Sequence, residues 1–406
     1  MSPSTSSASC NDWIEKGTPA FRRANWSLFA AGLATFGLLY CVQPLMPEFS
    51  REYGISAAVS ALSLSVTTAI LAFGMLFAGV FSDTWGRKNV MAISLFSSAL
   101  LTLLMLFAPG WKSLLVLRTL LGFTLSGLPA VAMTWLSEEM HPDSVGLGMG
   151  LYISGNAIGG LMGRLVTGVV ANWLGWRGGI AVVGVIGLAA AVCFWCYLPE
   201  SRHFVARPLR LRGLVARFGS LFRDPAFPFL FLEGFLLLGA FVTIYNYLGY
   251  RLLAPPFSVS QAVVGLMFAV YVVGMFSSTW MGTLSGRFGP RNVLWINFVL
   301  LFLGLLLTLA NHLGWILAGL VVLTFGFFGG HSVASSWVGR RSLHSRAQAS
   351  SLYLFCYYLG SSVAGASGGL FYADEGWMGV AVFVGILAIL GLGIALYLRR
   401  IPPLRP

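Results

Sequence analysis

Residues 79–88, GVFSDTWGRK, form the most informative stretch of the sequence. They lie between two long apolar runs and place one acid and two bases in a chain that has few charges. Because glycine permits tight turns, we expect one apolar helix to end near Gly79, the chain to turn at Gly86, and a second apolar helix to begin by Val90. The stretch therefore predicts a short charged loop between two helices. By itself it also fits an ordinary turn between two membrane spans.

The composition indicates a membrane protein. Of the 406 residues, 57% are hydrophobic and 9% are charged, whereas a soluble domain carries about 25% charged residues. The mean hydropathy of +0.82 makes lipid the expected solvent for most of the surface. Residues 1–16 are polar and rich in serine, which is not the pattern of a cleavable signal peptide, so the first span is expected to direct insertion.

The residue spacings that metal centres and enzymes need do not occur. Cys193 and Cys196 form a C-x-x-C, but no second pair or nearby histidine completes a metal site, so we assign both to packing. The sequence has no Walker loop for ATP and no nucleophile–base–acid arrangement in a soluble region. We therefore expect no enzymatic activity, no metal and no cofactor.

Long apolar stretches set the predicted fold class. A membrane span needs about 20 apolar residues to cross about 30 Å of hydrocarbon. The chain contains twelve such stretches, which predict an all-α membrane protein with twelve transmembrane helices and both termini on one side. The predicted spans are 26–47, 57–81, 89–108, 113–136, 145–171, 177–198, 226–250, 261–284, 292–311, 315–338, 347–372 and 377–398.

The net charge of +12 is explained by membrane topology. Of the 25 Lys and Arg residues, 19 lie on one face of the predicted spans and four on the other. Because Lys and Arg concentrate in cytoplasmic loops, this asymmetry places both termini in the cytoplasm. It accounts for the charge without a nucleic acid partner.

The second half of the chain repeats the first. Four pairs of positions recur at offsets between 201 and 204 residues: Gly79 with Gly282, Trp111 with Trp315, Tyr152 with Tyr353, and Trp176 with Trp377. A shift by six spans preserves orientation, so we expect two six-helix bundles related by an axis along the membrane normal.

The repeat also sets the predicted domain boundaries. These are a cytoplasmic tail (1–25), a first six-helix bundle (26–198), a cytoplasmic linker (199–225), a second six-helix bundle (226–398) and a cytoplasmic tail (399–406). Six arginines alternate with apolar residues in the linker. We expect the linker to form a basic amphipathic helix on the cytoplasmic surface, in contact with anionic lipid.

Residues 79–88 match the pattern G-x-x-x-D-x-x-G-R-K and resemble the signature loop between spans two and three of the major facilitator superfamily. With the repeat and the basic linker, the resemblance covers essentially the whole chain. It is closest to the twelve-span drug:proton antiporters and efflux permeases of bacterial inner membranes. The resemblance implies the major facilitator fold, transport by alternating access, and the proton gradient as the energy source.

The same resemblance implies that the loop forms a cytoplasmic gate. Asp83 would then meet the amino end of span eleven, near residues 347–350, where the helix dipole is positive. In the second half Gly286 stands in place of this acid, so one half alone would carry an acidic contact. The predicted gate residues are Gly79, Asp83, Gly86, Arg87 and Lys88.

Ionisable residues inside the spans are functional candidates, because burying a charge in the membrane is costly. Four qualify: Arg118, Arg164, Glu233 and His331. Arg118 and Gly122 match the second signature of the family, in which the arginine is tied to proton coupling. The alternative is an arginine that snorkels toward the periplasmic face.

Arg164 follows three glycines, Gly155, Gly159 and Gly163, that recur every four residues and predict close helix packing. The antiporter signature of the family has similar glycines with a proline after the central one. Here Gly160 occupies the place of that proline, so the stretch departs from the antiporter pattern.

Glu233 is the only acid inside a predicted span, and it lies about 10 Å deep at about 1.5 Å per residue from Ala226. Burial favours the neutral carboxyl, as a proton carrier needs. The alternative is a carboxylate that reaches the cytoplasmic surface and pairs with an arginine. Because a histidine ordinarily titrates near neutral pH, His331 is a second carrier candidate, with a packing histidine bonded to a neighbouring serine as its alternative.

Polar and aromatic residues near the midplane predict the substrate cavity between the halves. The candidates are Tyr40, Gln43, Asn156, Tyr245, Asn246, Tyr353 and Tyr357. Aromatic and amide groups with few charges suit an amphipathic or aromatic solute, although such rings also serve in helix packing and at the membrane interface.

The sequence thus predicts a monomeric, proton-coupled exporter of small amphipathic compounds or drugs in a bacterial inner membrane. Two alternatives stay open. One keeps the fold and takes up or exchanges a small organic anion or sugar, which two arginines against one acid inside the spans would favour. The other is a membrane sensor that binds a ligand without moving it, although no tail is long enough for a signalling domain.

Overall fold

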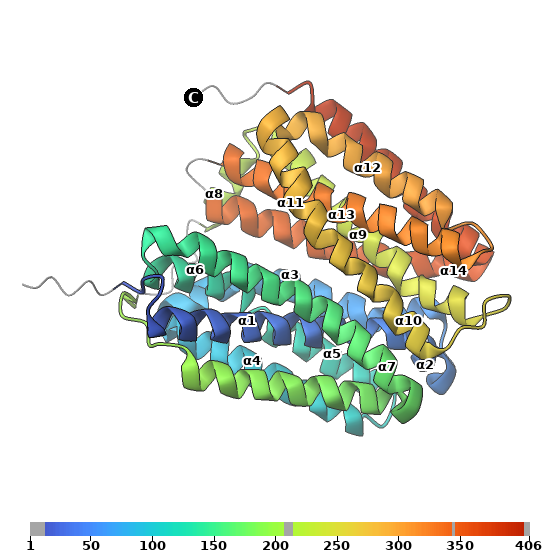
Figure 1. Ribbon diagram of the computed structural model, residues 1–406, viewed down its shortest axis with the longest axis horizontal. Coiled ribbons are helices and arrows are strands. Elements are labelled where there is room, and N and C mark those ends of the chain that lie inside the picture. The colour runs from blue at the N-terminus through green and yellow to red at the C-terminus, as the bar shows by residue number, and fades with distance from the viewer. Residues whose placement is uncertain (1–12, 207–213, 343–345, 402–406) are drawn as a thin grey trace, which may run out of the picture.

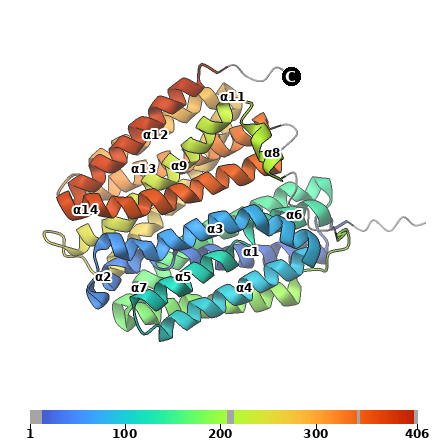
Figure 2. The same ribbon diagram turned by 180° about the vertical axis from the view of Figure 1, so that it is seen from behind.

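The computed structural model describes residues 13–206, 214–342 and 346–401. Within these ranges the chain is almost entirely helical, and the helices gather into two bundles, α1 to α7 and α9 to α14 (Figure 1). Seen from behind, the start of α1 and the end of α14 again lie on the same side of the molecule (Figure 2). The all-helical membrane fold predicted from the sequence is confirmed.

The elements of the first bundle are α1 (Pro19–Tyr40), the short 3₁₀ helix η1 (Gln43–Leu45), α2 (Met46–Tyr53), α3 (Ala57–Trp85), α4 (Arg87–Leu104), η2 (Met105–Phe107), α5 (Trp111–Leu125), α6 (Pro129–Glu139) and α7 (Pro142–Tyr197). The second bundle consists of α9 (Ala226–Leu253), α10 (Gln261–Met267), η3 (Phe268–Val270), α11 (Tyr271–Phe288), α12 (Pro290–Leu307), α13 (Leu313–Arg341) and α14 (Arg346–Leu398). We call the end that holds residues 83–88 the loop end, predicted to be cytoplasmic, and the opposite end the far end.

Two helices are too long for one membrane crossing. At about 1.5 Å per residue, the 56 residues of α7 and the 53 of α14 would exceed a hydrocarbon core of about 30 Å more than twofold. Each contains a glycine with positive φ, Gly175 at 65° and Gly376 at 56°, between the two spans predicted for that stretch. Among the described residues, ten helical stretches are long and apolar enough to cross a membrane, so the twelve crossings stay a prediction.

The predicted span 113–136 is interrupted. The helix stops at Leu125 and begins again at Pro129, as α5 and α6. Proline has no backbone N–H and fits the first turn of a helix better than its interior. The sequence Ser126-Gly127-Leu128-Pro129 therefore favours a break where the apolar pattern alone suggested a continuous helix.

The turn at Gly86 has a counterpart in the second half. Gly86 has φ of 90° between α3 and α4, and Gly289 has φ of 83° between α11 and α12. Both values lie in a region that residues with a side chain rarely adopt. The structure thus places the predicted loop turn at Gly86 and repeats its conformation 203 residues later.

The glycines of α7 lie against α1. A Cβ at Gly155, Gly159 or Gly163 would overlap the backbone of Phe29, Leu33 or Gly37, respectively. Backbone therefore packs on backbone along this contact, as the four-residue glycine spacing predicted.

Among the described residues, hydrogen bonds between the two bundles join α2 to α9 and η1 to α10 near the far end, where α2 and α10 are labelled in Figure 1. The Ser50 and Tyr250 hydroxyls are 2.7 Å apart, and Gln261 Nε2 donates to the Pro44 carbonyl at 2.5 Å. Close backbone packing supports the same contact, because Gly168 of α7 meets Gly265 of α10.

The linker is described in part. Residues 201–206 follow the first bundle, and α8 (Leu214–Leu221) precedes the second. Residues 207–213, with three of the six linker arginines, lie outside the described residues. The basic amphipathic helix and its lipid contact stay predictions.

Candidate functional site

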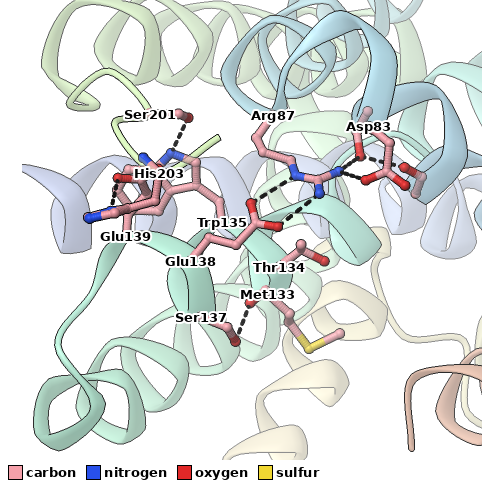
Figure 3. A network of polar contacts seen from close by, with 12 residues as sticks. Asp83, Arg87, Met133, Thr134, Trp135, Ser137, Glu138, Glu139, Ser201 and His203 are labelled. Atoms are coloured by element: carbon pink, nitrogen blue, oxygen red, sulfur yellow. Dashed lines mark hydrogen bonds and ion pairs between the residues drawn. The ribbon is translucent and has the colours of Figure 1, made fainter. Parts of the chain in front are cut away.

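Arg87 is the centre of a charged network at the loop end (Figure 3). Its Nη1 lies 2.6 Å from Asp83 Oδ1 and donates to Ser82 Oγ at 2.6 Å. Its Nε and Nη2 donate to the two carboxylate oxygens of Glu138 at 3.0 and 2.9 Å. This bidentate pair joins the start of α4 to the end of α6, and it shows that Arg87 connects two loops of one bundle.

Lys88 makes a second connection within the same bundle. Its Nζ donates to the Leu198 carbonyl at 2.8 Å and to Glu200 Oε1 at 2.6 Å. The predicted contact of Asp83 with residues 347–350 is not among the contacts that the structure describes for Asp83, which pairs instead with Arg87 four residues ahead. The hydrogen bonds that the described residues form between the bundles lie at the far end, and Asp83 pairs within its own bundle.

Glu139 fixes the beginning of the linker to the first bundle. Its side chain is 1% exposed and accepts hydrogen bonds from the backbone N–H groups of Arg202 and His203 at 3.0 and 2.9 Å. The His203 ring stacks on Trp13, with centroids 4.4 Å apart, and Trp135 Nε1 donates to Ser201 Oγ (Figure 3). The chain before α1 and the chain after α7 therefore meet at the same acid.

Replacing Glu138 by Gln is expected to loosen the loop end. The amide keeps one acceptor but loses the charge that matches Arg87, and because the Glu138 side chain is 32% exposed the cost should be only about 1 kcal/mol. A melting curve of the purified protein in detergent measures it. Asp143→Asn is the matched control, because that side chain is 91% exposed. Equal melting temperatures for the Glu138 variant and the wild type would contradict the assignment.

Arg118 is fully buried in α5 and bonded entirely to backbone. Its Nε donates to the Ser63 carbonyl at 2.6 Å, and Nη1 and Nη2 donate to the Leu38 and Leu39 carbonyls at 3.1 and 2.7 Å. Leu38 and Leu39 belong to the last turn of α1, whose carbonyls lose their helical partners because the helix ends at Tyr40. Arg118 therefore neither snorkels nor faces a carboxyl; it holds the broken end of α1 against α3.

Arg164 lies between the bundles, at the head of a chain of hydrogen bonds. It is 3% exposed, and its Nε donates to Gln43 Oε1 at 2.6 Å while Nη1 donates to the Gly160 carbonyl at 2.5 Å. Gln43 Nε2 in turn donates to Asn246 Oδ1 at 2.8 Å. Two predicted cavity residues, one from each half, are thus brought together by an arginine.

Aromatic rings from both halves surround the Arg164 guanidinium. Its Cζ lies 3.8 Å from the ring centroid of Tyr40, 4.6 Å from that of Tyr271 and 5.4 Å from that of Phe268. Tyr245 packs behind this group, 5.0 Å from Tyr271 between centroids, and its hydroxyl lies 2.9 Å from Thr324 Oγ1. Such contacts stabilise a cation by about 0.5–2 kcal/mol each but do not neutralise it.

Glu233 is a buried acid without a polar partner. It is 0% exposed in α9, and neither carboxylate oxygen has a hydrogen-bond partner among the described residues. The alternative of a carboxylate paired with a surface arginine does not occur in this conformation. An isolated carboxylate would be far more costly to bury than a neutral carboxyl, so this geometry favours the protonated form.

His331 lies in a stack of rings close to Glu233. Its Nδ1 is 3.0 Å from the Tyr353 hydroxyl, and its ring stacks on Tyr357 with centroids 4.4 Å apart. The Tyr353 ring packs against Gly234, the residue after Glu233. His331 is therefore bonded to a tyrosine rather than to the serine considered from the sequence.

The remaining cavity candidate, Asn156, faces the α1–α7 contact. Its Oδ1 is buried beside Gly32 of α1, and no described residue lies in hydrogen-bond geometry with it. The seven candidates therefore form a group at Arg164 and Gln43 that includes Tyr40, Tyr245 and Asn246, a second group of Tyr353 and Tyr357 at His331, and Asn156 apart from both.

Sequence reasoning did not find several partners of these residues. Tyr271 and Phe268 contact Arg164 from the other half of the chain, and no local motif marks them. Glu138 and Glu139 lie just after the predicted span 113–136, and no local motif marks them either. Their position at the end predicted to be cytoplasmic, like that of residues 83–88, is the signal that could have linked Glu138 to Arg87.

Comparisons with known proteins agree with this geometry. The model of the Major Facilitator Superfamily matches residues 28–257 and 235–406. The chain is 48% identical over 388 residues to the uncharacterized MFS-type transporter YybF of Bacillus subtilis, covering 96% of each. It is 49% identical over 390 residues to the inner membrane transport protein YnfM of Escherichia coli, covering 96% of this chain and 94% of that one.

Among solved structures, a bacterial homologue of the human lysosomal transporter Spinster, inward-facing and unoccupied, matches with a TM-score of 0.81 at 16% identity. The match covers 94% of this chain and 98% of that one, which shows a shared fold. The family model, the two relatives and the fold lead to one conclusion: the chain is a multi-pass membrane transporter and belongs to the major facilitator superfamily.

Proposed function

We propose that the protein is a proton-coupled exporter of small amphipathic compounds in a bacterial inner membrane, working by alternating access. The observation that carries this proposal is Glu233, buried in α9 with both carboxyl oxygens unpartnered among the described residues. Burial without a hydrogen-bond partner favours the protonated carboxyl in this position. A conformation that admits water or a cation to this carboxyl would release the proton, which couples its protonation to the transport cycle.

The position of Glu233 supports the coupling. Asn246, on the same helix α9, bonds to Gln43 of the first bundle at 2.8 Å. The Tyr353 ring from α14 packs beside Gly234. A rearrangement between the bundles would move α9 relative to its neighbours and change the surroundings of the carboxyl. The residues 79–88 and their partners Glu138 and Glu200 would hold the loop end of the first bundle together during this movement.

Similarity to other proteins supports the proposed direction of transport and the proposed bacterial inner membrane. The YnfM relative is named as an inner membrane transport protein, and the charge asymmetry predicts cytoplasmic termini. Export is favoured by the likeness of the signature loop and of Arg118-x-x-x-Gly122 to drug:proton antiporters. A second candidate, uptake or exchange of an organic anion, is favoured by one observation: Arg164 is a buried cation that forms no ion pair with a described acid.

Everted membrane vesicles test the proposed function. Respiration acidifies their interior, and an exported compound that exchanges for protons is expected to dissipate this pH gradient, which a fluorescent amine reports. The panel contains amphipathic cations, neutral aromatics and aromatic carboxylates, each added to vesicles with and without the protein. Protein-dependent movement of a labelled compound that is unaffected by collapsing the pH gradient would refute proton coupling.

A further inference from the structure

The arginine between the bundles, Arg164, has a positive charge that its described partners do not balance. Its hydrogen bonds run to the Gln43 side-chain oxygen and to the Gly160 carbonyl, and both acceptors are neutral. Among the described residues no acid forms an ion pair with it. Because the side chain is 3% exposed, water compensates little of the cost of burying the charge.

Two other arginines of this chain show how the edge of a guanidinium formed by Nε and Nη2 binds a carboxylate. Arg87 uses Nε and Nη2 for the two oxygens of Glu138. Arg341 uses Nε and Nη2 for the two oxygens of Asp224, at 2.6 and 3.0 Å. In Arg164 the Nε position of this edge holds the amide oxygen of Gln43. Gln43 thus occupies the place that one carboxylate oxygen takes in the other two pairs.

Arg118 does not compete for this role. All three of its guanidinium nitrogens donate to backbone carbonyls of α1 and α3, and the Leu39 carbonyl has no second described donor, so turning this guanidinium toward a ligand would leave a buried carbonyl unpaired. One guanidinium therefore remains available to a ligand inside the bundles. A single positive charge matches a singly charged carboxylate.

The aromatic rings around Arg164 favour a ligand whose carboxylate is attached to an aromatic ring. Tyr40 comes from the first bundle, and Tyr271 and Phe268 from the second, so the arginine is enclosed at the contact between bundles. Flat aromatic faces favour stacking with another flat ring. Substrate sites in transporters built from two repeats lie at such a contact.

We propose that Arg164 binds the carboxylate of a small aromatic acid, that Gln43 is the resident group which this carboxylate displaces, and that Tyr40 and Tyr271 hold the ring. The site names a substrate class for the transport activity proposed above and rests on it. Displacement has a mechanical consequence, because Gln43 also donates to Asn246 of the second bundle. An acid that replaces Gln43 at Arg164 frees this link and so favours opening at the far end.

Binding of benzoate to the purified full chain in detergent tests the site, measured by calorimetry and by the shift in melting temperature. Benzamide and benzylammonium have the same ring with a neutral or positive head group. We expect benzoate to bind at least about tenfold more tightly than either, because a bidentate carboxylate–guanidinium pair is charge-assisted. Equal binding of benzoate and benzamide would overturn the proposal.

Gln43→Glu is the decisive variant. Its carboxylate is expected to occupy the edge of Arg164 permanently, which keeps the protein folded and reduces benzoate affinity by at least about tenfold. If Gln43 served only to hold the fold together, Gln43→Glu would not reduce the affinity for benzoate in this way. Arg164→Gln should also abolish benzoate binding, and if that variant does not fold, Gln43→Glu still decides. Arg177→Gln, a surface arginine at the far end that pairs with Glu52, is the matched control and should bind benzoate like the wild type.

The outcome is separable from proton coupling, because binding is measured without a gradient. Benzoate binding that Gln43→Glu removes supports the site even if transport proves independent of pH. Proton-coupled export of cations or neutral compounds together with no benzoate binding would refute the carboxylate site and leave the proposed function standing. Unchanged benzoate affinity in Gln43→Glu would also refute it.

Discussion

Replacing Glu233 by Gln is expected to abolish the dependence of transport on the pH gradient while leaving the protein folded. Gln has nearly the shape of a protonated glutamic acid, and in this conformation Glu233 is buried without a partner for either oxygen. The variant therefore mimics the protonated state permanently and has no proton to release. With one proton exchanged per solute, gradient-driven accumulation in vesicles should fall by about tenfold for each pH unit of the gradient, because one pH unit corresponds to about 1.4 kcal/mol.

Exchange of labelled for unlabelled compound across the membrane, measured without a gradient, separates coupling from general damage. It requires the protein to reorient with substrate bound, and a variant locked in the protonated form should retain it. Asp374→Asn is the control, because that acid lies at the exposed turn of α14. Undiminished gradient-driven transport in Glu233→Gln would eliminate Glu233 as the carrier and direct attention to His331.

Replacing Arg118 by Met is expected to have the largest effect on stability of any single substitution considered. The guanidinium donates to three carbonyls at distances of 2.6 to 3.1 Å, and methionine fills a similar volume without a donor. The Ser63 carbonyl still accepts from Thr67 Oγ1, and the Leu38 carbonyl still accepts from Cys41 Sγ. The Leu39 carbonyl has no second described donor. Leaving buried acceptors unpaired should cost about 2–4 kcal/mol.

The melting temperature of the purified protein, and the fraction that elutes as a single species, measure this loss. Arg118→Lys should recover part of it, because one ammonium group reaches fewer carbonyls than the guanidinium fork does. Arg177→Met should lose at most about 1 kcal/mol, because its pair with Glu52 is exposed. A wild-type melting curve for Arg118→Met would show that the end of α1 is held by other contacts.

The fold was predictable where composition and repetition decide it. The apolar stretches and the turn at Gly86 follow directly from residue types, and the glycine spacing before Arg164 predicted close helix packing, which the structure places against α1. The break before Pro129 was readable from the proline but was overridden by the apolar pattern around it. The bends at Gly175 and Gly376 fall in the gaps between predicted spans, each directly before a residue of the repeated pair Trp176 and Trp377.

The site was predictable only as a set of candidates. The free-energy cost of burying a charge identified Arg118, Arg164 and Glu233 as candidates. The same cost applies to a guanidinium bonded to backbone carbonyls and to one that binds a ligand, so it cannot distinguish the two. The partners of Arg118 are backbone groups, which look the same at every position of a sequence. Two of the rings that enclose Arg164, Phe268 and Tyr271, lie about 100 positions further along the chain. The third, Tyr40, lies more than about 100 positions before it, and only helix packing brings the three rings together.

The glycine contact between α1 and α7 has a consequence for how substrate preference can evolve. Because backbone lies on backbone there, no side chain can adjust to a new neighbour. A single methyl group at Gly159 would displace α1 as a whole, and Tyr40 and Gln43 would move with it relative to Arg164. Variants selected for transport of new solutes should therefore carry substitutions at the α7 glycines that pack on α1, although these glycines do not contact the solute. Substitutions among the residues around Arg164 are expected as well.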